Sequence, residues 1–213
     1  MIESLLISIV IGIIWSQIIS HWGASILLHR YYCHKQFEVP VWFEVVGLYM
    51  LMVAVIRTPI GWIASHRMHH HHSDGPQDPH AAKHVGFWKV LLTTWDIPSI
   101  PVRYAKDLFA NPRLLFCHKY WKHIWIANWV ISFLISPYFF VAFALVPFVF
   151  AKIGFGLLNT VGHRTEGGAN VPWLNLFIAG EGYHREHHDD SKLVRLHKWD
   201  TAGWIAEKLF INR

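Results

Sequence analysis

His66-Arg-Met-His-His70 and His184-Arg-Glu-His-His188 are two five-residue stretches that have the same histidine spacing. A further pair, His29 and His34, is separated by four residues. On a helix, residues three and four positions apart lie on one face, so each stretch aims two or three imidazoles at one point. Histidine is the commonest side-chain metal ligand near neutral pH. Because adjacent histidines can serve two nearby metals, the spacing predicts a centre that holds more than one ion.

A less conspicuous element adds a ninth histidine. Asn159 and His163 lie four residues apart near the end of a long apolar run, so they share one helical face. The Asn159 amide could then hold a metal-bound water. All-imidazole ligation suits iron, zinc or copper, and nine ligands exceed the three or four of one zinc site. The predicted ligands are His29, His34, His66, His69, His70, His163, His184, His187 and His188.

Two further expectations concern the pair His29 and His34 and the histidines outside the predicted ligand set. Positions i and i+5 do not share a face of an α-helix, so we expect His29 and His34 where the first helix ends and unwinds. Seven further histidines fit no such spacing, and we expect them to contact solvent or lipid headgroups: His71, His72, His80, His84, His118, His123 and His197.

The composition favours a bilayer over water. Hydrophobic residues make up 53% of the 213 residues, and charged residues make up 15%, against about 25% in soluble domains. The net charge of +5 fits basic residues that face anionic lipid on the cytoplasmic side. No basic run is interleaved with aromatic residues, so nucleic acid is not an expected partner. Cys33 and Cys117 predict no disulfide framework and fit a reducing compartment.

Long uncharged runs predict the membrane spans. Residues 4–28 contain no charged side chain and would form a helix of about 37 Å, enough for a hydrocarbon core of about 30 Å. Residues 124–162 contain one charge and are long enough for two spans, 124–137 and 138–162, with a turn at Ser136-Pro137. The apolar segment 40–62 is ambiguous, because its uncharged part, 45–56, is short of the ~17–25 residues that a span needs.

The metal ligands settle the role of segment 40–62. If it crossed the membrane, the first histidine pair and the second stretch would lie on opposite faces and could not share a centre. We therefore expect it to be re-entrant, interfacial or buried in protein. Nearly all Lys and Arg residues then lie on the metal side, which predicts a cytoplasmic centre and an outside N-terminus. The expected fold is one domain, 1–213, an all-α membrane protein with about three transmembrane helices, a re-entrant or interfacial helix, and a cytoplasmic helical cap around a di-metal centre.

The combined histidine pattern resembles that of the membrane fatty acid desaturases. Residues around it narrow the resemblance to the delta-9 acyl-CoA and acyl-lipid group: Phe37 to Trp42, Ser73-Asp74 with Asp78-Pro79-His80, Arg103-Tyr104 through Tyr120-Trp121, Asn159 with His163, and Gly180 to Tyr183. The similarity covers roughly residues 22–210.

The resemblance implies two irons bound by the nine histidines, with a water on one iron held by Asn159. It implies oxygen-dependent removal of two hydrogens from adjacent methylenes of a saturated acyl chain, which leaves a cis double bond, expected at the delta-9 position. The acyl chain could be carried by CoA, a carrier protein or a lipid, and ferredoxin or cytochrome b5 would supply electrons. Four basic residues could contact an acidic donor or a substrate headgroup, or could simply face lipid: Lys83, Lys89, Arg103 and Lys106.

Two departures and three alternatives remain open at this point. The family usually has two spans before the first histidine pair, whereas this chain has room for one. Animal members have Thr-Trp where this chain has Phe155 and Gly156, so chain length and double-bond position stay open. A di-iron membrane hydroxylase or an alkene-forming enzyme would share every histidine. A metal transporter or sensor would place its ligands within the spans, and a purely structural membrane protein would tolerate loss of the histidines.

Overall fold

The structure is a computed structural model, and it describes residues 1–54, 57–94 and 99–211. Every regular element in these residues is helical, and a single isolated bridge pairs Asn170 with Tyr183. The helices of the first half are α1 (Ile2–Ile19), η1 (Ser20–Cys33), α2 (Val41–Val53), α3 (Pro59–His72), α4 (Ala82–Val85), α5 (Phe87–Leu91), η2 (Val102–Tyr104) and η3 (Lys106–Ala110). Those of the second half are α6 (Pro112–Ile135), α7 (Pro137–Phe140), η4 (Val141–Leu145), α8 (Val146–Val161), η5 (Pro172–Leu176), α9 (His184–Asp189), α10 (Thr201–Ala206) and η6 (Glu207–Ile211). The prediction of an all-α protein is confirmed for the described residues.

Two continuous helices in the described residues are long and apolar enough to cross a membrane. They are Ile2–Cys33, which joins α1 to η1, and Pro137–Val161, which joins α7, η4 and α8. They contain or closely match the predicted spans 4–28 and 138–162. The predicted span 124–137 corresponds to the second half of α6, whose first half carries three basic residues, Arg113, Lys119 and Lys122. The structure therefore supports two spans by length and composition, and the third stays a prediction.

The apolar segment 40–62 forms two helices rather than one. The thirteen-residue α2 ends at Val53, and α3 begins at Pro59, where the Thr58 hydroxyl caps it by accepting a hydrogen bond from the Gly61 amide at 3.2 Å. Residues 55–56 of this segment lie outside the described residues. The predicted turn at Ser136-Pro137 is confirmed, because Ser136 ends α6 and its hydroxyl accepts the Phe139 amide of α7 at 3.0 Å.

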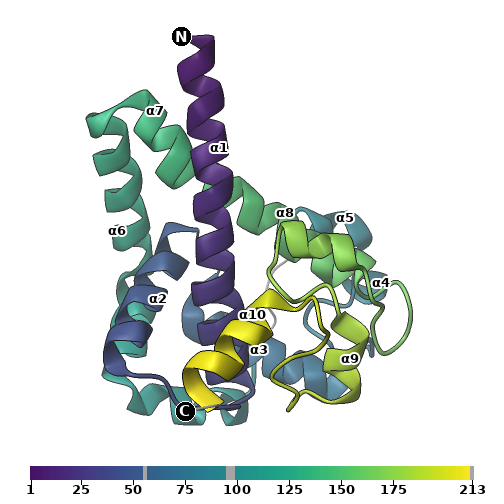
Figure 1. The fold of residues 1–213 in the computed structure, drawn as a ribbon. Helices are drawn as coiled ribbons and strands as arrows, with labels where there is room; N and C mark the ends of the chain where they lie inside the picture. The colour runs from purple at the N-terminus through teal and green to yellow at the C-terminus, as the bar shows by residue number, and fades with distance from the viewer. Residues whose placement is uncertain (55–56, 95–98, 212–213) are drawn as a thin grey trace.

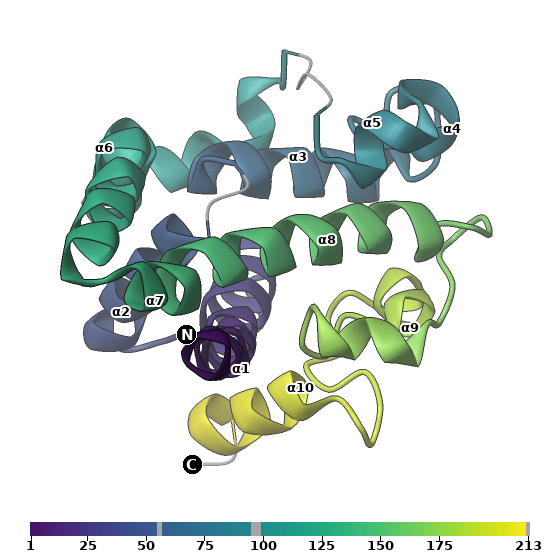
Figure 2. The ribbon, with the colours of Figure 1, turned by 90° about the horizontal axis from the view of Figure 1, so that it is seen from above.

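The helices are unevenly distributed between the upper and lower ends of the molecule (Figure 1). The N-terminal end of α1 projects upward beside α6 and α7, whereas α3, α9 and α10 lie in the lower part of the molecule (Figure 1). Seen from above, α8 runs between α3 on one side and α9 on the other (Figure 2). The main core packs η1, α2, α3 and α6 together through fully buried side chains such as Leu27, Leu48, Ile63 and Leu114. This packing fixes η1 and α3, the two segments that carry the pair His29 and His34 and the stretch from His66 to His70.

Candidate metal centre

The first histidine pair lies on a π-helix. The His34 amide donates a hydrogen bond to the His29 carbonyl at 3.1 Å, which is the i to i+5 bond of a π-turn. A π-turn contains more residues than an α-helical turn, so residues five positions apart lie on one face of the helix. Both imidazoles therefore point the same way. The first helix ends at this pair, as expected, because Cys33 is its last residue and His34 is its C-cap, but its last turn is a π-turn rather than unwound chain. A chain that remains helical through Cys33 holds both side chains more firmly than a loop would.

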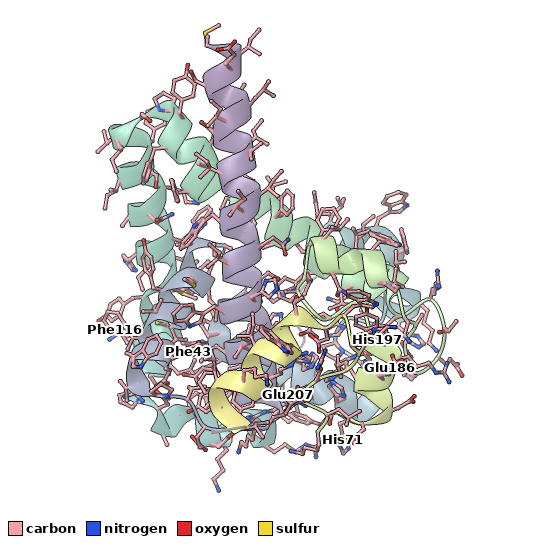
Figure 3. The ribbon with its side chains drawn as sticks, in the orientation of Figure 1. Phe43, His71, Phe116, Glu186, His197 and Glu207 are labelled. Carbon is pink, nitrogen blue, oxygen red and sulfur yellow. The ribbon has the colours of Figure 1, made fainter. Side chains whose placement is uncertain are left out.

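The other predicted ligands come from three further places in the fold. His66, His69 and His70 lie on α3, and His184, His187 and His188 lie on α9. His163 follows the C-terminal end of α8. Side-chain nitrogens gather beside α9 at the lower end of the molecule, where His197 and Glu186 are labelled (Figure 3). All nine predicted histidines converge there in two adjacent groups.

The first group contains five histidines whose Nε2 atoms form a closed ring. Successive Nε2 atoms lie 2.8–3.1 Å apart around the ring. In a neutral imidazole, Nε2 either donates a proton or accepts one. Donors and acceptors cannot alternate around a ring of five, so hydrogen bonds alone leave at least one mismatched contact. A cation at the middle would satisfy every lone pair at once. The members are His29, His34, His66, His70 and His187.

The second group contains His69, His163, His184 and His188. Its Nε2 contacts are 2.7 Å between His163 and His184, 3.1 Å between His184 and His188, and 3.3 Å between His69 and His188. Two nitrogens that each lie ~2.1 Å from one metal at a right angle are about 3.0 Å apart. The spacing in both groups therefore fits donors that share a metal ion.

Burial prepares these imidazoles for ligation. Loss of solvent, followed by the proximity of the other histidines, lowers the pKa of His70 to about 2. The same causes lower the pKa of His188 to about 4, although Asp74 and Asp78 oppose the shift. The pKa values of His66 and His187 fall well below the ordinary value for the same reasons. Neutral imidazoles offer the lone pairs that a metal needs. The residues present fit a pair of redox-active metals such as iron.

Three carboxylates each contact the Nδ1 atom of one predicted ligand and so orient its imidazole. Asp78 Oδ2 lies 2.7 Å from His69 Nδ1, Glu181 Oε2 lies 2.9 Å from His29 Nδ1, and Asp74 Oδ1 lies 3.1 Å from His163 Nδ1. A carboxylate at Nδ1 fixes the tautomer that leaves the Nε2 lone pair free for a metal. These three acids were not among the functional residues predicted from the sequence. Only their positions in the sequence could have indicated a role: Asp74 and Asp78 closely follow the stretch that ends at His70, and Glu181 lies three positions before His184.

Glu181 belongs to a wider buried network. Its Oε1 accepts a hydrogen bond from Arg30 at 2.8 Å, and Arg30 also donates to Asp200 Oδ2 at 2.8 Å. Arg30 is 1% exposed and Asp200 is fully buried. His29 and the nearby Arg30 cation hold the pKa of Glu181 low, at about 2, against the opposing effect of burial. The network links the first ligand to the N-terminal cap of α10, which Asp200 forms.

His80 contradicts the expectation that it contacts solvent or headgroups. It is only 6% exposed, and its ring centroid lies 4.4 Å from that of His69. Its Nδ1 lies 3.6 Å from Asp78 Oδ1. His69 already directs Nδ1 to Asp78 and Nε2 to His188. Asp78 and His80 therefore surround the second group of ligands, and they do not form a third metal site with His69. Of the other histidines, His71, His84 and His123 are exposed as expected.

A cavity lies against both histidine groups. It is lined by Asn159 together with ligands of both groups, among them His66 and His69, and by the apolar side chains of Trp62 and Phe155. Asn159 therefore faces the same space as the predicted ligands. Two smaller, mostly apolar cavities adjoin this one, and Phe155 lines all three; we call the smaller two its extensions. The larger one runs between η1, α2 and α8 and is lined by Ile19, Leu51, Pro147, Phe150, Ala151 and Phe177, with other residues.

The four basic residues predicted to contact a donor or headgroup do not form one cluster. Lys83 and Lys89 are exposed on α4 and α5, and Lys83 Nζ lies 3.6 Å from the exposed Glu166. Arg103 is exposed on η2, which packs beside α3, and Lys106 is exposed on η3, which packs beside α6. None of the four is among the described residues that line the cavity beside the histidines.

The fold and the site together define a helical protein with two adjacent all-histidine groups that could hold metal ions and that line an apolar cavity. The profile of the fatty acid desaturases matches residues 4–197. The chain is 30% identical over 211 residues to delta-9 acyl-lipid desaturase 2 of Arabidopsis thaliana, an alignment that covers 88% of this chain and 67% of that protein. It is 29% identical over 208 residues to the sn-1 stearoyl-lipid 9-desaturase of Anabaena variabilis, covering 88% of this chain and 74% of that protein. The corresponding Synechocystis protein is 31% identical over 205 residues, covering 87% of this chain and 63% of that protein.

The chain belongs to the fatty acid desaturase family. It is accordingly a fatty acyl desaturase, an oxidoreductase of lipid metabolism.

Proposed function

We propose that this protein introduces a cis double bond at the delta-9 position of a saturated, lipid-linked acyl chain. Two hydrogens and their two electrons leave adjacent methylenes, and a donor supplies two further electrons and solvent two protons, so that one O2 is reduced to two waters. The observation that carries the proposal is the pair of adjacent histidine groups beside an apolar cavity. The names of the three relatives specify 9-desaturation and lipid-linked acyl chains, which supports the proposed position of the double bond and the proposed carrier.

The nine histidines would hold two irons, five at one ion and four at the other. When bound, the irons supply the activation of oxygen. Asp78, Glu181 and Asp74 keep three imidazoles in the ligating tautomer. Asn159, on the same cavity wall, would hold a water beside one ion.

The cavity would position the acyl chain. Trp62 and Phe155 pack edge to face with ring centroids 5.5 Å apart, and both line the space beside the histidines. The methyl end would occupy the apolar extension between η1, α2 and α8. Apolar walls exclude water from the reacting methylenes. Phe155 lines the cavity and both extensions, so its size and rotamer would determine which extension the chain enters.

We also propose the three-span topology, with an outside N-terminus and a cytoplasmic metal centre. Apolar side chains on the second half of α6 are well exposed, including Ile131 at 58% and Leu134 at 76%. Contact with lipid would explain that exposure, because soluble proteins rarely expose such contiguous apolar surface. The thirteen-residue α2 is too short to span and would remain on the metal side.

Expression in a desaturase-deficient host tests the function. Lipid analysis should show new mono-unsaturated chains, and His187→Ala should abolish them because it removes a ligand that is 1% exposed. His84→Ala, a change at an exposed histidine, is the matched control and should leave the product in place. Unchanged lipids with either ferredoxin or cytochrome b5 co-expressed would refute the proposal, and hydroxylated chains would instead indicate a hydroxylase.

A further inference from the structure

A buried arginine lies between two carboxylates beside the five-histidine group. Arg30 directly follows the predicted ligand His29 on η1, and its guanidinium bridges the two acids: Nη1 donates to Glu181 Oε1 and Nη2 donates to Asp200 Oδ2, each at 2.8 Å. Arg30 is 1% exposed, Glu181 is 4% exposed and Asp200 is fully buried. A buried charge is strongly destabilising once its partner is removed, so each of these three groups depends on the others.

The guanidinium of Arg30 has one position available to it. Its Nε donates to the carbonyl of Val194 at 2.9 Å, and its Nη1 also donates to the hydroxyl of Ser25. A guanidinium is planar and holds its five N–H donors in a rigid fork. Contacts at Nε, Nη1 and Nη2 therefore fix both the place and the plane of the group. Because the fork is rigid, a displacement of Asp200 is passed on to Glu181.

Asp200 anchors the bridge to α10. Its Oδ1 accepts the amide of Gly203 at 2.8 Å, which caps the first turn of α10, and its Oδ2 also accepts the amide of Leu196 at 3.0 Å. The start of α10 packs against η1, where the hydroxyl of Thr201 lies 2.8 Å from Nε2 of His21. Figure 1 shows α10 beside the lower half of the first long helix. The position of this carboxylate therefore depends on how α10 packs against η1.

Glu181 carries the bridge to the ligand. Its Oε1 accepts the guanidinium and also the hydroxyl of Ser25 at 2.5 Å, while Oε2 lies 2.9 Å from Nδ1 of His29. The other ring nitrogen of His29, Nε2, lies 3.0 Å from that of His187 and 3.1 Å from that of His34. Without the guanidinium, Glu181 would be a buried carboxylate with no cation, and it would take up a proton or turn away. The Nδ1 tautomer of His29 would then no longer be fixed.

The four-histidine group has no such bridge. Its two carboxylates, Asp74 and Asp78, contact His163 and His69 directly. Within the described residues, neither of these acids forms an ion pair with an arginine or a lysine. A change at α10 should therefore reach the five-histidine group and leave the four-histidine group as it is.

We propose that Arg30 and Asp200 are positioning residues for the five-histidine group, and that the packing of α10 sets the metal affinity of this group through Glu181 and His29. The inference rests on the proposed function, because it takes the five histidines to hold one of the two irons. It assigns a role in metal binding to α10, a helix that contributes no ligand.

Titration of the metal sites tests the coupling. The full chain in detergent is titrated anaerobically with Fe²⁺ against a chelator of known affinity, with folding checked by circular dichroism. Asp200→Asn should weaken one of the two binding steps by about 10- to 100-fold, the usual effect of losing an outer partner of a ligand, and leave the other step unchanged. Arg30→Lys, which keeps the charge and loses the fork, should weaken the same step. Glu207→Gln is the matched control: it removes a partly exposed contact with Arg195 at 3.8 Å just beyond α10 and should change neither step.

A double variant separates positioning from a loss of stability. If the effect passes through Glu181, Asp200→Asn should cause no further loss of iron affinity in a Glu181→Gln protein, although it should still lower the free energy of unfolding. Additive losses of affinity would overturn the proposal, as would equal weakening of both steps or an unchanged affinity in both Asp200→Asn and Arg30→Lys. Lipid analysis of the unchanged protein is the separate check on the reaction: two bound irons without a double bond would refute the proposed function and leave the coupling to be judged by the titration.

Discussion

Replacing Asp78 by Asn removes one negative charge from a fully buried site without changing its shape. Asp78 Oδ2 accepts from His69 Nδ1 at 2.7 Å and from the Asp74 amide at 2.9 Å, while Oδ1 accepts from the His80 amide at 3.0 Å. All three partners therefore require an acceptor. An asparagine offers one oxygen, so its NH2 group must face at least one donor whichever way the amide is turned.

The expected cost falls mainly on metal binding. If the NH2 group faces His69, the imidazole must give up its Nδ1 proton or rotate, and either change removes the Nε2 lone pair from the second group. Loss of such an orienting carboxylate costs about 10- to 100-fold in metal affinity, which is about 1.4 to 2.7 kcal/mol. Glu181→Gln should cost a similar amount. Asp74→Asn should cost less, because the Asp74 side chain is 12% exposed and water can replace part of the contact.

Competition with a chelator of known affinity measures the effect. Metal retained by the unchanged protein and by Asp78→Asn is titrated in the same detergent at neutral pH, with folding checked by circular dichroism. Asp189→Asn is the matched control: it makes the same chemical change on α9 at a carboxylate that is 69% exposed. Metal retention by Asp78→Asn equal to that of Asp189→Asn would refute the orienting role.

Four further outcomes follow from the geometry. The metal-free protein should unfold at lower temperature as the pH falls from about 6.5 towards 4, measured by thermal melts: burial lowers the pKa of His188 from 6.5 to about 4, so in that window the unfolded chain binds more protons and the free energy of unfolding decreases. Phe155→Ala should merge the cavity with its extensions and change the chain-length preference, measured by product analysis. Gly156→Ala should lower stability by about 1–3 kcal/mol in denaturant titrations, because the added methyl group would overlap a backbone carbonyl of α5. Asp200→Asn should cost about 3 kcal/mol in the same assay, because it breaks a buried ion pair with Arg30.

The spacing of the histidines was enough to predict which side chains meet. Three and four residues along a helix are neighbours whatever surrounds the helix, so the groups on α3 and α9 could be expected from local geometry. The spacing of Asn159 and His163 placed both at the end of α8, and Asn159 does line the cavity. The division into five and four ligands could not be expected, because it depends on how η1, α3, α8 and α9 cross in space.

Two features that the sequence did not reveal have a common physical origin. His29 and His34 lie where the first helix ends, as expected, but the last turn of that helix is a π-turn, which local propensity does not reveal. His80 has no ligand spacing in the sequence, yet the loop after α3 folds it against His69 and buries it. In both cases long-range contacts overrode the local pattern. The departure at Gly156 also has a spatial reason, because α5 approaches α8 so closely there that only glycine fits.

Counting iron in an active preparation tests the central claim most directly. The protein is purified anaerobically from cells in which it forms mono-unsaturated chains, and iron and protein are quantified in the same sample. Five and four imidazoles around two ions predict about two irons per chain, with a clear loss in His187→Ala. One iron or fewer per chain in a preparation that still desaturates would contradict a centre built from all nine histidines.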